Sequence, residues 1–455
     1  MAFNEIPMKG GKLSLRPAHY LLLGFAGAIL MGAILLWLPV STNGAPISFV
    51  DALFTSTSAV CVTGLIVVDT GTKFTLFGQL VILTLIQMGG LGIMTFSVFF
   101  MILLGKRISF KGRVAIHDSF SHSPFKDFSG MLRAIFVIAF GIEALGAIGL
   151  TLCFARDFPL RQAIYSAVFH SISAFCNAGF SLFPDSLVRY QNSIPVNVIF
   201  MLLIVFGGLG FLVLIDLPAL FDKHRKVSLH TKIVLITTGG LIFFGAVFIF
   251  VTEYADQLAA LPMRGKILAS FFQSITPRTA GFNTISYARL TNATLFFTLF
   301  LMFVGASPGS CGGGIKTSTF SILLILVWRR IHGHRRVSVL QRTLPQEVTD
   351  RVIVITFLAF VTVFFATMIL LVSEGWGVPT GRERLHLINI LFEVVSAFGT
   401  VGLSTGITAS LSAFAKVVLV AVMYVGRVGP ATVAFSMRPQ EEEHFQYAEE
   451  HAMVG

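Results

Sequence analysis

The sequence predicts an all-α integral membrane protein whose four pseudo-repeats surround a central pore. Its composition, with 55% hydrophobic and only 12% charged residues, is far more apolar than a soluble domain, in which about 25% of residues are charged. A short glycine motif recurs four times, at intervals of roughly 100 to 120 residues, which indicates internal repetition. Each copy follows an apolar run too short to cross a bilayer, which needs about 20 helical residues.

The four copies of the motif share a small polar residue and a glycine followed by Leu or Phe. They are Ser58–Leu65 (S-A-V-C-V-T-G-L), Ser173–Phe180 (S-A-F-C-N-A-G-F), Ser274–Phe282 (S-I-T-P-R-T-A-G-F) and Ser396–Leu403 (S-A-F-G-T-V-G-L). Glycine tolerates positive φ and close backbone approach. Matched glycines in four copies therefore predict four chain segments that meet backbone to backbone, as a pathway for a dehydrated cation requires.

Each repeat is expected to contain an outer helix, a re-entrant pore half-helix, a filter loop and an inner helix. The first half-helix, 49–60, can only dip into the membrane and return. The predicted repeats are 18–104, 131–220, 231–328 with a broken inner helix, and 351–437, followed by a cytoplasmic tail, 438–455. The other half-helices are expected at 161–174, 264–275 and 384–397, and the other inner spans at 195–220, 292–328 and 411–437.

The distribution of basic residues predicts that both termini are cytoplasmic. With that orientation, the inner segments hold roughly twice as many Lys and Arg residues as the outer segments, among which Arg278 is counted. The basic N-terminal segment 1–17 precedes an apolar run too long for a signal-peptide core, and we interpret this run as a retained first span. The half-helices would then enter from outside, with their C-terminal ends pointing inward.

The net charge of +11 does not indicate nucleic-acid binding, because Lys and Arg lie in short loops between apolar runs. Four widely separated cysteines show no C-x-x-C spacing, which argues against a zinc site or a disulfide framework. They are Cys61, Cys153, Cys176 and Cys311.

The residues that end at the four glycines are the candidate ion-binding filter. They are Val62, Thr63 and Gly64; Asn177, Ala178 and Gly179; Thr279, Ala280 and Gly281; and Thr400, Val401 and Gly402. Their carbonyl oxygens would replace the hydration shell of an ion, and four helix C-termini would favour positive charge there. Because no carboxylate is needed, a monovalent ion fits better than calcium or magnesium. The pattern predicts a potassium or sodium pathway.

With one glycine per filter loop and a broken third inner helix, the chain resembles the Trk/Ktr/HKT superfamily of potassium transporters nearly end to end, and most closely its KtrB type of membrane subunit. The resemblance implies potassium uptake across a bacterial inner membrane, homodimers in membrane lipid, and a KtrA-like cytosolic nucleotide-binding ring as partner. Gly64 matches the potassium-preferring members. No cofactor is implied beyond potassium as the substrate, and sodium as a coupling or activating ion stays open.

A glycine-rich stretch interrupts the third inner span. It reads G-A-S-P-G-S-C-G-G-G-I-K, and its candidate gate residues are Gly305, Ser307, Pro308, Gly309, Gly312, Gly313, Gly314 and Lys316. No helix continues smoothly through it, and the resemblance implies a loop that obstructs the pore below the filter. A charge such as Arg427, in the fourth inner span, usually faces a cavity or a partner, and the resemblance implies that it lies beneath the filter and contacts this loop as part of the gate. Lys316 could instead snorkel to the interface, and Glu143 and Glu393 are interpreted as hydrogen-bonding residues between helices.

Three other functions were weighed. Residues 305–309 match the nucleophile-elbow pattern G-x-S-x-G, but they lie inside a membrane span with no histidine placed to serve Ser307. The segment 314–317, G-I-K-T, lacks the G-K-[ST] of a phosphate loop. An ion-coupled secondary transporter with alternating access stays open, although such folds usually show inverted repeats, whereas these four repeats run in one sense. The chain is therefore not expected to be an enzyme.

Overall fold

The computed structural model describes residues 17–92, 128–220, 222, 226–334, 336–375 and 387–436. Within these ranges the chain is helical apart from loops and one short hairpin of β1 (Ser338–Val339) and β2 (Arg342–Thr343). The predicted tail 438–455, the basic segment 1–16 and the part of the first inner span at 93–104 lie outside the described residues.

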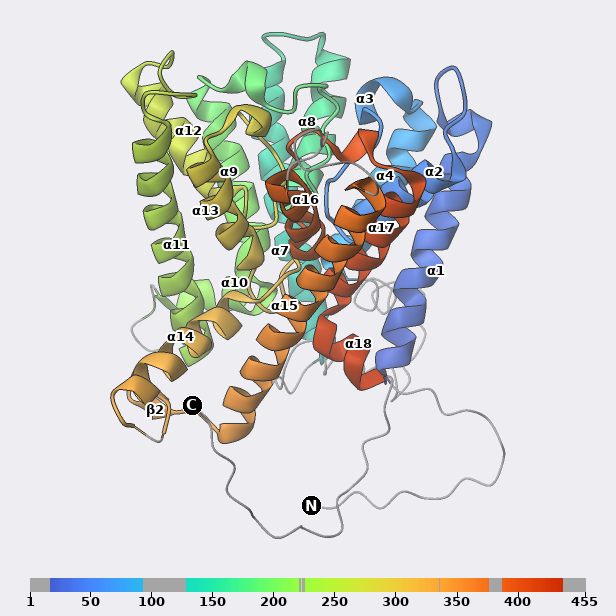
Figure 1. Ribbon diagram of the computed structural model, residues 1–455. Helices are drawn as coiled ribbons and strands as arrows, with labels where there is room; N and C mark the ends of the chain where they lie inside the picture. Colours follow the sequence, from blue (N-terminus) through green and yellow to red (C-terminus); the bar gives the residue numbers. More distant parts are fainter. Residues whose placement is uncertain are drawn as a thin grey trace, which may run out of the picture.

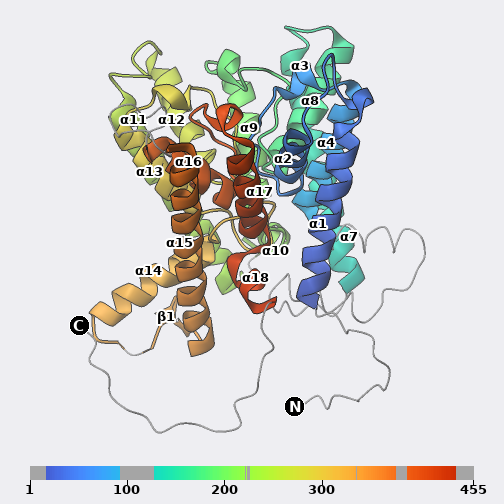
Figure 2. The same ribbon diagram turned by 45° about the vertical axis from the view of Figure 1, so that its right-hand side comes forward.

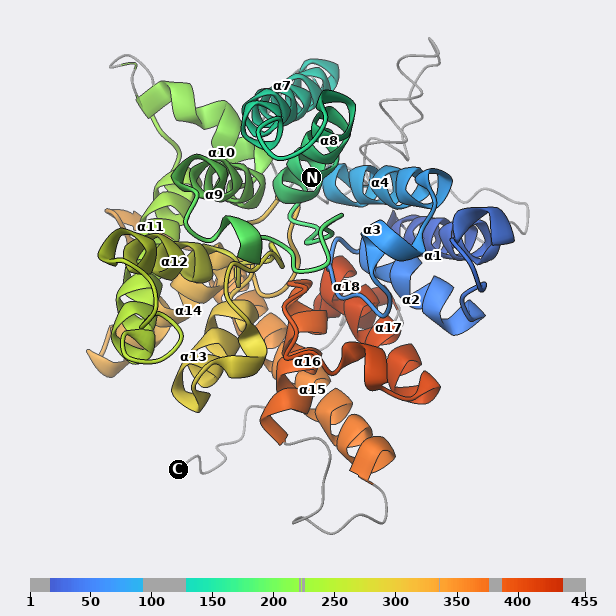
Figure 3. The same ribbon diagram turned by 90° about the horizontal axis from the view of Figure 1, so that it is seen from above.

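Four helical units surround a common centre, where loops from all four meet (Figure 3). Each unit has one long outer helix that is apolar enough to cross a membrane by its length and composition. The outer helices, upright in Figure 1, are α1 (Pro17–Trp37), α7 (Phe128–Phe154), α11 (Leu229–Glu253) and α15 (Gln346–Gly375). This arrangement agrees with the predicted all-α membrane fold.

Each outer helix is followed by a half-helix of 12 to 16 residues that cannot span a bilayer. The half-helices are α2 (Phe49–Val60), α8 (Leu160–Phe175), α12 (Met263–Ile275) and α16 (Leu387–Gly399). A serine begins the first of them, since the Ser48 hydroxyl accepts a hydrogen bond from the backbone N–H of Asp51 at 3.1 Å. Every half-helix runs directly into its glycine motif at its C-terminal end.

The inner helices stop at or near glycines instead of crossing in one piece. They are α4 (Leu76–Leu91), α9 (Ile194–Leu209), α13 (Asn292–Phe303) and α17 (Ala413–Val428). Gly92, Gly210 and Gly429 follow three of these helices with φ of +86°, +92° and +96°, a conformation that side chains rarely adopt. The chain then bends by 101° between α9 and α10 (Phe211–Asp216), and α18 (Pro430–Ser436) follows α17. The expectation of continuous spans at 195–220 and 411–437 was therefore wrong.

The inner helix of each repeat packs against the half-helix of the next repeat. The contacting pairs are α4 with α8, α9 with α12, α13 with α16, and α17 with α2, so the fourth repeat closes on the first. Within repeats 1, 2 and 4, glycines also bring the inner helix close to the half-helix of its own repeat, because a Cβ on Gly89, Gly207 or Gly426 would overlap the carbonyl oxygen of Val60, Phe175 or Phe398. Each of these carbonyls lies four residues before a filter glycine.

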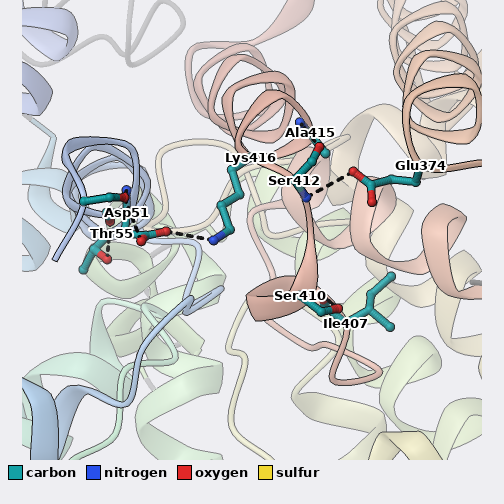
Figure 4. A network of polar contacts seen from close by, with 9 residues as sticks. Asp51, Thr55, Glu374, Ile407, Ser410, Ser412, Ala415 and Lys416 are labelled. Carbon is teal, nitrogen blue, oxygen red and sulfur yellow. Dashed lines mark hydrogen bonds and ion pairs between the residues drawn. The ribbon is translucent and has the colours of Figure 1, made fainter. Parts of the chain in front are cut away.

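An ion pair strengthens the closure between the fourth and first repeats. Lys416 of α17 donates from Nζ to a carboxylate oxygen of Asp51 on α2 at 2.8 Å (Figure 4). Nearby, the Thr55 hydroxyl donates to the Asp51 carbonyl, and Glu374 accepts from the backbone N–H of Ser412. Sequence reasoning missed this pair because its members are 365 residues apart.

We expect Asp51→Asn and Lys416→Met to be coupled in a double-mutant cycle. The two side chains are 22% and 13% exposed, so solvent screens the pair only in part, and we expect a coupling energy of about 1 kcal/mol in the free energy of unfolding. Equilibrium unfolding of the two single variants and the double variant in detergent micelles measures it. Strictly additive effects would show that the pair does not help to close the ring.

Candidate functional site: the ring of glycine loops

The four motif glycines form a closed ring in which each approaches the backbone of the next repeat. A Cβ on Gly64 would lie 2.6 Å from the carbonyl oxygen of Ala178, and one on Gly179 would lie 3.0 Å from that of Ala280. A Cβ on Gly281 would lie 2.5 Å from the carbonyl oxygen of Val401, and one on Gly402 would overlap that of Thr63. No side chain larger than hydrogen fits at these four positions without displacing backbone.

The backbone of the four loops repeats the same unusual conformation. The glycines have φ between +70° and +91°, and the residue two positions before each glycine also has positive φ. These earlier residues are Val62 (55°), Asn177 (56°), Thr279 (77°) and Thr400 (51°). Positive φ costs a non-glycine residue about 1–3 kcal/mol, and β-branched residues tolerate it poorly. Strain kept at four equivalent positions points to a functional backbone geometry.

Hydrogen bonds return from each loop to the end of its half-helix. The N–H groups of Thr63, Ala178 and Val401 donate to the carbonyls of Ser58, Ser173 and Ser396 at 2.7–2.8 Å. The Ser58 and Ser396 hydroxyls also accept from the N–H groups of Gly64 and Gly402, at 3.0 and 3.1 Å. The small polar residue of the motif therefore orients the filter backbone.

In the third repeat, the residue that orients the filter backbone is not Ser274, which the sequence comparison placed opposite Ser58. Thr276, not Ser274, accepts from the N–H of Ala280 at 2.9 Å and donates from its hydroxyl to Phe282. Ser274 instead donates to Ile242 on the outer helix α11 at 2.7 Å, as Ser56 does to Ile29 on α1. The alignment of Ser274 with Ser58 was therefore wrong. Ser274 and Thr276 correspond to Ser56 and Ser58 of the first repeat, and each lies one residue closer to its filter glycine than its counterpart does.

The carbonyl oxygens of the twelve predicted filter residues accept no hydrogen bond from any residue that the structure describes. Ten of the twelve residues are buried, and Gly179 and Gly402 are half-buried. Buried backbone carbonyls nearly always have a partner. A ring of carbonyls without one, at the negative ends of four half-helix dipoles, is suited to a cation.

The acidic side chains in this part of the protein are engaged elsewhere. Glu143 of α7 accepts from Gln87 of α4 at 3.1 and 3.2 Å, and Glu393 accepts from the hydroxyls of Ser404 and Thr408. Glu143 links α7 to α4, as predicted from the sequence, whereas Glu393 ties α16 to the loop and the short 3-10 turn that follow its own filter. Over the described ranges, no group of three or more His, Cys, Asp or Glu side chains could hold a metal ion. The candidate ion ligands are backbone oxygens.

The glycine-rich segment 304–316 separates α13 from α14 (Thr317–Ile331) and lies against the filter loops. The Gly313 N–H donates to the Thr400 hydroxyl at 2.9 Å, and a Cβ on Gly312 would overlap the Thr279 side chain. Toward the second repeat, Ser307 and Cys311 donate from their N–H groups to Gly208 and Gly207. The segment therefore touches the filters of repeats 3 and 4 and the inner helix of repeat 2.

Arg427 joins this segment to two other repeats. From α17 its guanidinium donates to the carbonyl of Cys311 in the segment and to the carbonyl of Gly89 on α4. Lys316 does not reach away from the segment, because its Nζ donates to the carbonyl of Gly312 at 2.6 Å. The Ser307 hydroxyl accepts from Thr317 at 2.9 Å. Ser307, Lys316 and Arg427 thus belong to the same contact region as the glycines of the segment, beside the filter loops of repeats 3 and 4.

Arg278 is a site residue that the sequence analysis misplaced. It was counted with the outer basic residues, but it is only 6% exposed and its guanidinium donates to the Thr238 hydroxyl of α11 at 3.3 Å. It lies one residue before Thr279 of the filter. An arginine inside an otherwise apolar motif was the available signal, since such charges usually face the protein interior.

Comparisons with known proteins agree with this architecture. A family model described as TrkH, cation transport protein, matches residues 28–446. The Ktr system potassium uptake protein B of Bacillus subtilis (strain 168) is 37% identical over 96% of this chain and 97% of its own length. The potassium/sodium uptake protein NtpJ of Enterococcus hirae is also 37% identical, over 97% of this chain and 98% of its own length.

A solved structure supports the fold independently. The potassium transporter TrkH from Vibrio parahaemolyticus superposes with a TM-score of 0.73 at 20% identity, over 95% of this chain and 87% of its own. The matched family transports cations and is not a family of enzymes, which agrees with the expectation from the sequence. The match covers all four repeats and the ring between them, and the chain therefore belongs to the TrkH family of cation transport proteins.

Proposed function

We propose that this protein takes up potassium through a filter of backbone carbonyls at the glycine ring. The observation that carries the proposal is the set of twelve filter carbonyls that accept no hydrogen bond within the described residues. A bare alkali ion would supply their missing partner. Two relatives carry potassium in their names, the uptake protein B and the NtpJ protein.

The ligand chemistry favours a monovalent ion over a divalent one. Calcium and magnesium sites usually include ionised carboxylates. Here Glu143 accepts hydrogen bonds from Gln87 on α4, Glu393 accepts them from the loop after its own filter, and the candidate ligand oxygens are uncharged backbone carbonyls. Helix dipoles give a partial negative charge that suits a weakly hydrated ion.

We propose that the segment 305–314 is the gate. Its contacts with Thr279 and Thr400 support a position across the pathway just below the filter. Arg427 supports the closed arrangement, because one guanidinium holds both the segment and α4. Opening then requires that these hydrogen bonds be exchanged for others. The charge of Arg427 would also repel a cation that leaves the filter.

We propose that the chain works as a homodimer in the bacterial inner membrane, with both termini cytoplasmic and a cytosolic nucleotide-binding ring as partner. Two relatives are named as proteins B and D of a Ktr system, a name that implies further components. Alternating access is the second candidate mechanism. The ring disfavours it, since four repeats of one sense surround a fixed axis. Co-purification with a regulatory ring tests the partner.

The function is tested by potassium-dependent growth and uptake in a host that lacks its own potassium transporters. We expect the protein to restore growth at low potassium, and Gly64→Ser to lower the preference for potassium over sodium roughly tenfold, since about 1.4 kcal/mol of lost ligation is sufficient. A Cβ at this position meets the Ala178 carbonyl. Gly406→Ser is the control, because Gly406 also has positive φ (+96°) but no atom within 4 Å of its Cβ position. A carrier with alternating access would keep its ion preference in both variants.

A further inference from the structure

A cavity of about 210 Å³ opens at the end of α14 that lies away from the gate segment. Its lining residues come from the last turn of α14, the hairpin region and the start of α15. These elements lie at the lower edge of the ribbon in Figures 1 and 2. Its lining includes Arg330, Arg336, Val337, Gln346 and Thr349. None of these residues belongs to the filter or to the gate.

The cavity carries positive charge that no residue in the described ranges neutralises. Within the described part of the chain, the side chains of Arg330 and Arg336 make no hydrogen bond or ion pair. The neighbouring Arg329 is different, because it donates to the Ser338 carbonyl at 3.2 Å and so fastens the hairpin to α14. Gln346 is the first residue of α15, a helix of 30 residues, and its positive dipole end adds to the charge of the two arginines. The cavity is therefore suited to an anion.

An apolar stripe on α14 leads to this cavity. Leu324, Val327, Trp328 and Ile331 follow the helical spacing i, i+3, i+4, i+7 and are 49% to 75% exposed. In a membrane protein such a stripe faces lipid chains, and tryptophan marks the level of the headgroups. A soluble anion would use the cavity alone. A phosphate that carries acyl chains would use the cavity and the stripe together.

We propose that this cavity binds the phosphate headgroup of an acidic phospholipid whose acyl chains lie along the stripe on α14. Arg330 and Arg336 donate to the phosphate oxygens, and the planar guanidinium groups match that geometry. Basic pockets at helix ends on the cytoplasmic side are sites of this kind. The proposal rests on the cavity, on two arginines without a partner among the described residues, and on the stripe. It does not depend on which ion the protein transports.

Quenching of Trp328 fluorescence by brominated lipid tests the site in the full-length protein. In a Trp37→Phe/Trp376→Phe background, Trp328 is the remaining tryptophan. In vesicles of phosphatidylcholine with a minor fraction of phosphatidylglycerol, one lipid at a time is brominated. We expect brominated phosphatidylglycerol to bind roughly tenfold more tightly than brominated phosphatidylcholine, since each basic residue adds a several-fold electrostatic attraction.

Three variants and one competitor decide the outcome. Arg330→Gln/Arg336→Gln should bring the preference close to one, and Arg336→Gln alone, which leaves α14 unchanged, should lower it several-fold. Arg342→Gln, an exposed residue of β2 outside the cavity lining, should keep the full preference. The proposal is overturned if the double variant keeps the preference, if the unsubstituted protein shows none, or if millimolar inorganic phosphate abolishes it, since that would indicate a site for soluble anions.

Discussion

Gly402→Ala is expected to abolish cation uptake. Residue 402 has a φ of +89°, and an added Cβ would overlap the Thr63 carbonyl oxygen and lie 2.8 Å from the Cα of Gly64. Backbone must therefore move in both the fourth and the first filter loops. Losing the contacts of two ligand carbonyls with an ion costs about 3 kcal/mol, which corresponds to roughly a hundredfold weaker binding. Tracer uptake at limiting potassium measures the loss.

Gly406→Ala separates this effect from simple backbone strain. Gly406 has a φ of +96° and lies four residues further along the same loop, but its added Cβ would meet open space. It should keep more than about half of the uptake, since positive φ in a non-glycine residue costs about 1–3 kcal/mol of stability but leaves the carbonyls of the ring in place. Equal loss in both variants, or full uptake by Gly402→Ala, would mean that the ring does not carry the ion.

Arg427→Ala is expected to raise the maximal rate of uptake by about tenfold or more. The side chain donates two charge-assisted hydrogen bonds, one to Cys311 in the gate segment and one to Gly89 on α4. Together such bonds are worth about 3 to 6 kcal/mol, so their loss should populate the open segment. The variant also removes a positive charge below the filter. Uptake at saturating potassium, normalised to the amount of protein in the membrane, measures the change.

Arg427→Lys separates two effects of Arg427: the pair of hydrogen bonds that tethers the gate segment to α4, and the positive charge that repels cations. Lysine keeps the positive charge but lacks the planar fork that reaches two carbonyls at once. If the tether holds the gate, the lysine variant should resemble the alanine variant; if repulsion dominates, it should resemble the unsubstituted protein. Unchanged kinetics in both variants would remove Arg427 from the gating mechanism.

The parts of the fold that depend on chain length and on glycine were predictable. The half-helices could be recognised because 12 to 16 apolar residues cannot span a bilayer. The four filter glycines could be recognised because their conformation and spacing exclude other residues. The four matched motifs led to the hypothesis that their glycines form a ring. In the structure, each of Gly64, Gly179, Gly281 and Gly402 lies against the backbone of the next repeat.

Other features could not be predicted, because they depend on which segments meet. Gly89, Gly207 and Gly426 bring backbone segments of one repeat close together, and the breaks at Gly210 and Gly429 beside two of them were missed. The sequence of an apolar run does not show whether one of its glycines adopts a positive φ and so ends the helix. The anchoring role of Thr276 and the Asp51–Lys416 ion pair depend equally on tertiary contacts.

The central claim is that the four glycine loops coordinate a bare monovalent cation. An experimental structure of the protein in rubidium or thallium, two heavy substitutes for potassium, tests it most directly through anomalous scattering. We predict an anomalous peak on the axis of the ring, within coordination distance of carbonyl oxygens from all four loops. A ring without a peak, together with strong peaks at acidic side chains elsewhere in the membrane, would contradict the account.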